Sequence, residues 1–221
     1  MIDKEVLGKN IRIEEMKTGE INQVAIILTN AFETNPAYSL IFNRTGKLRE
    51  GLLWLFKTNL FLINRRQTLT KVIKENDSNK ITGTFTLIPP KGIKNTLSDY
   101  LHTGLFRFIL QFGFRTLFKM LGMDSFNKNT LKNSVKAEKY YYLSMVAIKE
   151  EYRGKGIGSF AVKRCLDELS KTEKECRLVG LTTQLPENVA FYSRLGFETL
   201  DEGYVAFKKH KYSNWNMIYF F

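Results

Sequence analysis

Residues 142–158 read YLSMVAIKEEYRGKGIG, in which a β-prone run leads through a glycine-rich turn into the start of a helix. Glycines at positions 154, 156 and 158 let the backbone turn sharply and approach a ligand closely. The first N–H groups of the following helix have no partner inside it, and they face the turn with the positive end of the helix dipole behind them. Arg153 and Lys155 add positive charge. The stretch therefore predicts a strand–turn–helix unit whose turn can cradle a pyrophosphate group.

A glycine-rich turn of this kind also has a plain structural interpretation, as a tight connection between a strand and a helix. Two familiar phosphate-binding motifs do not fit it. The Gly-Lys-Ser/Thr order and the spacing of the Walker loop are absent, and the glycines of the dinucleotide-binding fingerprint are spaced differently and open a βαβ unit. The choice between the two interpretations depends on the rest of the chain.

The segments around this unit alternate between strand-like and helix-like patterns. Apolar residues recur every three or four positions over residues 21–32, as on one face of a helix, and this pattern stops before Pro36. By similar criteria the sequence predicts strands at 11–13, 68–73, 81–87, 140–148, 178–183, 203–207 and 216–220, helices at 48–61, 97–121, 156–169 and 187–195, and a lysine- and asparagine-rich loop at 124–136. This order indicates a single α/β or α+β domain over residues 1–221 with a mixed sheet.

Composition and charge limit the classes of protein that remain. The chain has 221 residues, with 34 Lys+Arg against 22 Asp+Glu and a formal net charge of +12, which suits a single core and favours an anionic partner. Two cysteines and two histidines are too few for a disulfide framework or a histidine-rich metal centre, so we expect no metal site. The sequence shows neither a signal peptide nor an apolar run of membrane-spanning length, and we therefore expect a cytoplasmic protein.

Residues 142–158 resemble the acetyl-CoA-binding motif of the GNAT superfamily of N-acetyltransferases. The family signature Arg/Gln-x-x-Gly-x-Gly/Ala is matched by Arg153, Gly156 and Gly158. A second family motif, an asparagine followed by a tyrosine and Leu-Gly-Phe, is similar to NVAFYSRLGF at residues 188–197, and weaker likenesses are AFETNP at 31–36 and GTFTLIPP at 83–90. The resemblance implies an α/β fold with a mixed, mostly antiparallel central sheet that is flanked by helices and has a splayed central strand.

The resemblance also implies a reaction and a site. Acetyl-CoA would be the cosubstrate, and a primary amine of a small molecule would attack its thioester directly. Backbone groups of the central strand would bind the pantetheine arm, N–H groups of the turn would bind the pyrophosphate, and Tyr192 would protonate the departing CoA thiolate. The cofactor-binding residues implied in this way are Val146, Ala147, Ile148, Arg153, Gly154, Lys155, Gly156, Ile157, Gly158, Ser159 and Asn188. From spacing alone, Tyr192 is equally well a packed aromatic residue, and Asn188 a residue that starts a helix.

The general base has no clear candidate in the sequence. Many members of the family carry a carboxylate in the strand after the CoA-binding helix, where this chain has Thr182, which cannot accept a proton at neutral pH. We expect deprotonation of the amine to pass through water or through a carboxylate such as Glu33, which is otherwise an ordinary solvated residue. A catalytically idle CoA-binding module therefore remains an alternative to an enzyme.

Residues 95–136 form an insertion of helix and loop that we expect to cover the substrate side. Arg107, Gln111, Arg115 and Lys119 recur there every four residues and predict one polar, mostly basic stripe on a helix. One interpretation is a surface helix that packs a wide apolar face over the sheet. The other is a basic amphipathic element that touches an anionic membrane surface. No RNA-binding pattern of aromatic and basic residues accompanies the stripe, so we do not expect a nucleic-acid partner.

Overall fold

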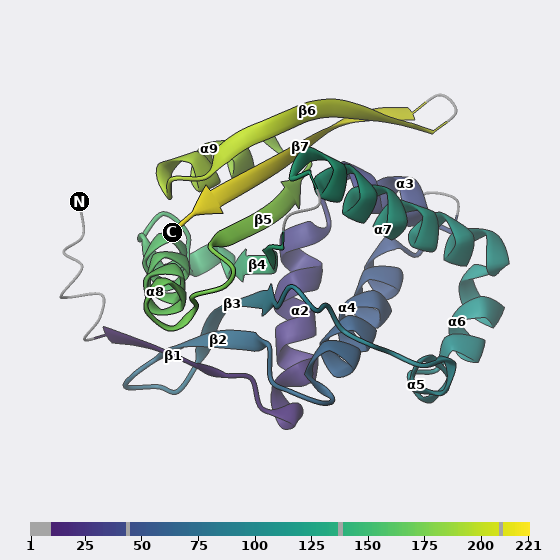
Figure 1. Cartoon of the computed structure of the whole chain (residues 1–221). Coiled ribbons are helices and arrows are strands. Elements are labelled where there is room, and N and C mark those ends of the chain that lie inside the picture. Colours follow the sequence, from purple (N-terminus) through teal and green to yellow (C-terminus); the bar gives the residue numbers. More distant parts are fainter. Residues whose placement is uncertain (1–9, 43–44, 137–138, 208–209) are drawn as a thin grey trace.

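The computed structural model describes residues 10–42, 45–136, 139–207 and 210–221, which form one mixed sheet covered by helices (Figure 1). In spatial order the strands found in these residues are β1 (Ile11–Glu15), β2 (Thr70–Glu75), β3 (Ile81–Ile88), β4 (Tyr141–Ile148), β5 (Leu178–Thr183), β7 (His210–Phe220) and β6 (Glu198–Phe207). Neighbouring strands run antiparallel except β4 and β5, which are parallel. The predicted α/β class with a mixed, mostly antiparallel sheet is therefore confirmed.

Helices cover both faces of this sheet (Figure 1). They are α2 (Ile21–Phe32), α3 (Pro36–Phe42), α4 (Leu48–Asn64), α5 (Leu97–His102), α6 (Leu105–Phe112), α7 (Phe114–Ser134), α8 (Ile157–Thr172) and α9 (Pro186–Arg194), with short 3₁₀ turns at Thr18–Glu20 and Glu150–Tyr152. Successive residues of a strand point to opposite faces, so Val72 packs with α2, α4 and α6 while Ile73 packs with α8 and α9. Both faces of β2 are thus apolar because both are covered.

Most of the predicted elements are present. Each predicted strand exists, although β6 and β7 are longer than expected, and the helices predicted at 21–32, 48–61, 156–169 and 187–195 correspond to α2, α4, α8 and α9. The sequence did not predict α3, which begins at Pro36. Proline is unfavourable inside a helix but favourable at its first position, because its missing N–H would have no partner there anyway.

Two predictions about the insertion were wrong. Residues 124–136 are not a loop, because α7 continues to Ser134. The apolar stretch at 97–121 is not one helix, because the chain breaks at Gly104 and Gly113, whose φ angles of 81° and 78° lie in the region that favours glycine.

The break at Gly113 also divides the predicted basic stripe. Arg107 and Gln111 lie on α6, whereas Arg115 and Lys119 lie on α7, so the four residues do not follow one helical face.

Candidate active site

The two parallel strands at the centre of the sheet separate soon after they meet. Their ladder in the described residues has two pairs, Tyr141 with Val179 and Tyr142 with Gly180. Beyond Tyr142, β4 continues to Ile148 without pairing to β5, so backbone groups on that side of β4 are open to a ligand. The splayed central strand expected from the sequence is therefore present.

A β-bulge in β4 lies at the same place. Ala147 faces Thr84 and Ser144 faces Thr86, so the two residues between them oppose a single residue of β3. One of the two, Met145, has a φ of 50°, which is rare for a residue other than glycine. The bulge bends β4 where it leaves β5, and it places Val146 in the core under α8 and Met145 in the core under α2.

The turn between β4 and α8 presents a run of free backbone donors. Gly154 and Gly156 have φ angles of 74° and 75°, which only glycine adopts readily. The first backbone bond of α8 joins the N–H of Phe160 to the carbonyl of Gly156 at 2.9 Å. Within the described part of the chain, the six N–H groups of residues 154–159 donate to no other protein group. Together with the N-terminal end of the helix dipole they suit an anionic group.

Gly158 has a different role from the other two glycines. A Cβ there would lie 3.1 Å from Cγ1 of Ile148 and 3.6 Å from Cζ of Phe191. The absence of a side chain therefore lets the first turn of α8 pack directly against β4 and α9. The predicted residues of the turn and of β4 are thus brought together, with Ile157 buried in the core and Ser159 half-buried beside it.

The two cations of the turn are held by different contacts. The Nε group of Arg153 donates to the carbonyl oxygen of Ile148 at 3.0 Å, so this side chain fixes the turn to the end of β4. The ammonium of Lys155 lies 5.1 Å from the centroid of the Tyr152 ring, and that of Lys80 lies 5.3 Å from the same ring. Both cations stay at the turn through attraction to the ring face.

Tyr192 and Asn188 lie on α9, which follows β5. The side chain of Asn188 donates to the hydroxyl of Thr183 at 3.1 Å and so ties the start of α9 to the end of β5. Tyr192 is buried between the rings of Phe191 and Phe197. Burial, and then the neighbouring Tyr142, raise the pKa of Tyr192 well above its usual value, so the phenol keeps its proton at neutral pH.

A partly buried network of neutral polar groups occupies the end of β5, where the sequence has Thr182 and no carboxylate. Asn35 donates to the side-chain carbonyl of Gln184 at 3.1 Å, and Gln184 donates to that of Asn214 at 3.0 Å. Thr182 donates to the side-chain carbonyl of Asn216 at 3.0 Å. These residues are far apart in the sequence, and no local pattern marks them as a group.

Glu33, the base suggested from the sequence, does not join this network. Its carboxylate pairs with Arg49 on α4 at 3.0 Å, and its side chain is 43% exposed. A second carboxylate, which the sequence did not single out, is Asp124 on α7. Burial chiefly, and then the charge of Asp124, raise the pKa of Tyr38 to about 12, and the same two causes contribute to the raised pKa of Tyr142. The carboxylate of Asp124 is itself 60% exposed and pairs with Lys128 at 2.6 Å.

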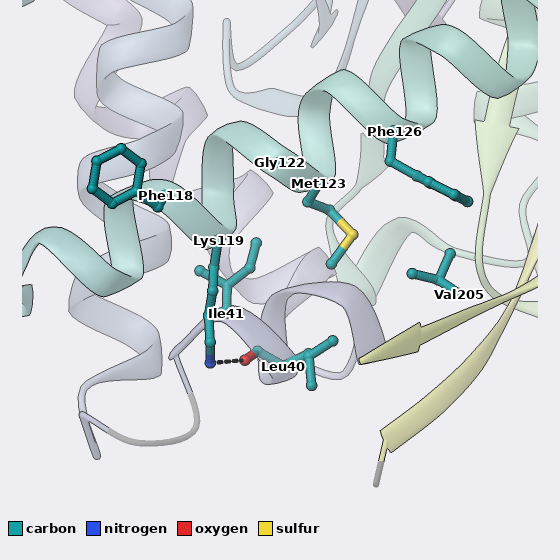
Figure 2. Close-up of a pocket in the computed structure, with 8 residues that line it drawn as sticks. All are labelled: Leu40, Ile41, Phe118, Lys119, Gly122, Met123, Phe126 and Val205. Atoms are coloured by element: carbon teal, nitrogen blue, oxygen red, sulfur yellow. Dashed lines mark hydrogen bonds between the residues drawn. The ribbon is translucent and has the colours of Figure 1, made fainter. Parts of the chain in front are cut away.

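A cavity of about 240 Å³ lies between α3, α7 and β6 (Figure 2). Its lining is mostly apolar and consists of Leu40, Ile41, Phe118, Lys119, Gly122, Met123, Phe126 and Val205. Lys119 reaches across from α7 and donates to the carbonyl oxygen of Leu40 at 3.0 Å, and Met123 points toward the same helix (Figure 2). The hydroxyl of Tyr212 donates to the sulfur of Met123. In the part of the chain that the structure describes, no three potential metal ligands lie together.

Comparison with known proteins gives one family and several similar folds. Residues 111–197 match the sequence model of the acetyltransferase (GNAT) family, a stretch that includes β4, the turn, α8, β5 and α9. No curated protein matches the sequence.

Among solved structures, histone acetyltransferase HPA2 and related acetyltransferase from Corynebacterium glutamicum is 17% identical, with a TM-score of 0.59 over 95% of each chain. Arylalkylamine N-acetyltransferase 2 from Aedes aegypti is 15% identical, with a TM-score of 0.57 over 96% of this chain and 99% of that one. The putative acetyltransferase yncA from Salmonella typhimurium, solved with its cofactor acetyl-CoA, is 13% identical, with a TM-score of 0.52 over 96% and 94%. At these identities the likeness concerns the fold.

Proposed function

We propose that this chain, of which residues 111–197 match the GNAT acetyltransferase family model, uses acetyl-CoA as its acetyl donor and transfers the acetyl group to a primary amine of a small molecule. The observation that carries the proposal is the early separation of β4 from β5 beside a turn rich in free N–H groups. This surface can bind an extended chain that carries amide groups and ends in a pyrophosphate, and CoA has this structure in its pantetheine arm and pyrophosphate.

Each part of the surface has its own role. The N–H groups of residues 154–159 bind the pyrophosphate through hydrogen bonds strengthened by its charge. The backbone of Val146, Ala147 and Ile148 pairs with the pantetheine arm as a short added strand would. Backbone N–H groups in the splay also stabilise the negative charge that develops on the thioester oxygen during attack. Asn188 holds α9, and with it Tyr192, against the end of β5.

Tyr192 supplies the proton that the leaving group needs. Acetyl-CoA provides a thioester, and the nitrogen of the amine forms a bond to its carbonyl carbon as the bond from carbon to sulfur breaks. The departing thiolate takes the proton of the Tyr192 phenol, since a phenol is protonated at neutral pH and can hydrogen-bond a developing thiolate. Solvent then returns a proton to the phenolate.

The acceptor site lies under the insertion in this proposal. The cavity between α3, α7 and β6 is large enough for the apolar part of a small amine, and residues 95–136 cover it through α7. Asp124 follows Met123 of the cavity lining, and its charge contributes to the raised pKa values of Tyr38 and Tyr142. Glu33 and Asp124 are both exposed and ion-paired, but Asp124 adjoins a residue of the cavity lining. We therefore assign the removal of the amine proton to Asp124, acting through water.

A cytoplasmic location is part of the same proposal. Both cysteines, Cys165 and Cys176, are free thiols, as is usual in a reducing compartment.

The test is an assay of CoA release against a panel of primary amines, with the variant Tyr192→Phe. Removal of the proton donor should lower kcat by roughly 10²-fold and leave the Kd for acetyl-CoA unchanged, because the ring and its packing remain. Tyr141→Phe is the matched control, since Tyr141 is packed in the same core but its hydroxyl donates to Glu173. Equal kcat values for the two variants would reject the role of Tyr192, and acetyl-CoA binding without release of CoA for any amine would reject the proposed reaction.

A further inference from the structure

The outer surface of the insertion is unusually apolar. Of the twelve large apolar side chains that are exposed in the described residues, eight lie on α5, α6 and α7. Phe106, Leu110, Phe114 and Phe118 are each between 62% and 71% exposed. Phe106 and Leu110 lie one turn apart on α6, and Phe114 and Phe118 lie one turn apart at the start of α7, so they form two exposed apolar pairs on either side of the break at Gly113. We call these four residues the outer stripe.

The outer stripe is not required by the protein core. The opposite side of α6 already supplies Phe108 and Phe112, whose rings stack on each other and pack on Trp54 and Phe42. A helix at the surface of a globular protein normally has one apolar face and one polar face. Helix α6 has two apolar faces, and the outer one has no partner among the described residues. Together the four side chains expose on the order of 500 Å² of apolar surface, as much as the largest patch on a typical monomer.

The charges beside the outer stripe have one sign. Between Asp99 and Asp124 the sequence has no acidic residue, and it has Arg107, Arg115 and Lys119. Arg107 and Arg115 are exposed and form no ion pair within the described part of the chain. The two acidic residues at the ends are engaged, Asp99 with Arg65 and Asp124 with Lys128. The surface is therefore apolar and positive at once.

We propose that α6 and the start of α7 bind the surface of an anionic lipid bilayer, with the outer stripe inserted at the level of the headgroups. Exposed phenylalanine and leucine side chains bury apolar area in that layer, while Arg107 and Arg115 reach the lipid phosphates and carboxylates. None of the described helices is long and apolar enough to cross a bilayer. A second protein copy would bury the apolar stripe equally well, but two copies would bring Arg107 and Arg115 against their like-charged counterparts.

Phe118 belongs both to the outer stripe and to the lining of the cavity between α3, α7 and β6 (Figure 2). The bilayer contact therefore places the mouth of the proposed acceptor site next to the membrane surface. The contact itself depends on α6 and α7 alone, and it stands whether or not the chain acetylates an amine.

The experiment is co-sedimentation of the whole chain with vesicles of phosphatidylcholine, with and without phosphatidylserine, at two salt concentrations. We expect binding to the anionic vesicles that weakens with salt. The variant Phe106→Ser/Phe114→Ser keeps the net charge, and its affinity for the anionic vesicles should fall by roughly tenfold or more. Its control is Ile26→Ser/Phe220→Ser, which removes two exposed apolar side chains elsewhere and should bind as the unmodified chain does.

The charges are tested separately. Arg107→Gln/Arg115→Gln should weaken binding by about 30-fold, whereas Arg177→Gln/Arg194→Gln, with the same net charge, should have little effect. The proposal would be overturned if the two double arginine variants lost vesicle affinity equally, or if Phe106→Ser/Phe114→Ser bound as the unmodified chain does. Either result would show that the overall charge of the protein causes the binding. A dimer in sedimentation equilibrium that Phe106→Ser/Phe114→Ser abolishes would also overturn the proposal, because a second copy would then occupy the stripe. A blue shift of tryptophan emission from Leu110→Trp on addition of anionic vesicles would support insertion directly, and its absence would contradict it.

Discussion

Replacement of Gly83 by alanine tests how firmly β3 holds the ligand-binding end of β4. Gly83 pairs with Ile148, the last residue of β4 before the turn. A Cβ at position 83 would overlap Cδ1 of Ile148 and lie 2.8 Å from the carbonyl oxygen of Ala147. The isoleucine side chain can turn away, but the carbonyl oxygen moves only if the backbone of β4 moves with it.

The expected cost follows from two opposing contributions. Overpacking of this kind destabilises a protein by about 1–3 kcal/mol. Alanine is favoured over glycine in a strand by roughly 0.5–1 kcal/mol, which offsets part of that loss. The free energy of unfolding should therefore fall by about 1–2 kcal/mol, and the Tm of a chain of this length by about 5 °C. Displacement of Ala147 and Ile148 should also weaken acetyl-CoA binding by about tenfold, since small errors of position are costly at a preformed site.

Urea unfolding and calorimetric titration with acetyl-CoA measure the two effects. The matched control is Gly203→Ala in β6, where a Cβ has no atom within 4 Å and should change neither quantity appreciably. If Gly83→Ala unfolds at the same urea concentration as Gly203→Ala and binds acetyl-CoA as tightly, then β3 does not fix the position of β4, and the reasoning is wrong.

Two further predictions concern acidic groups. Hydrogen bonds from Lys74 and then Arg12 lower the pKa of Glu14 to about 2, below its ordinary value of 4.5, so this carboxylate stabilises the fold above about pH 5 and loses that effect as the pH falls toward 2. The slope of stability with pH in this range should be shallower in Lys74→Met, as measured by urea unfolding, and an unchanged slope would refute the assignment. Asp124→Asn should lower kcat while Lys128→Gln, which breaks the same ion pair but keeps the carboxylate, should not; equal kcat values would remove Asp124 from the reaction.

The centre of the fold could be predicted because its signals are local. The glycines of residues 154–158 predict a turn without reference to the rest of the chain. The apolar run before them predicts a strand, and the amphipathic pattern after them predicts a helix. The same residues carry the resemblance to the GNAT family, and the splay that it implied appears as the two-pair ladder of β4 and β5.

The insertion was predicted less well because its helices lack a regular polar face. The second half of α7 is rich in lysine and asparagine, so its sequence has the composition of a loop. It contributes Leu131 to the core, and Val135 just beyond its end is buried beside it, which is too few apolar residues to show a helical period. Upstream, α6 has apolar residues on both sides, so the apolar pattern does not change at Gly104 and Gly113, where the helix begins and ends. Periodicity alone therefore gave one helix where the chain forms three.

The polar network of Asn35, Gln184 and Asn214 could not be found from the sequence at all. Its members come from the start of α3, the end of β5 and β7, and only the folded sheet brings them together. The same is true of Asp124, whose relation to Tyr38 depends on how α7 crosses α3.

Calorimetric titration of the unmodified chain with acetyl-CoA tests the central claim most directly. The claim is that the open edge of β4 and the N–H groups of residues 154–159 form the binding surface for this cosubstrate. We predict saturable binding of one molecule per chain with a Kd in the micromolar range, as cosubstrate sites commonly have. No binding heat at millimolar acetyl-CoA, confirmed by unchanged thermal stability, would contradict the account.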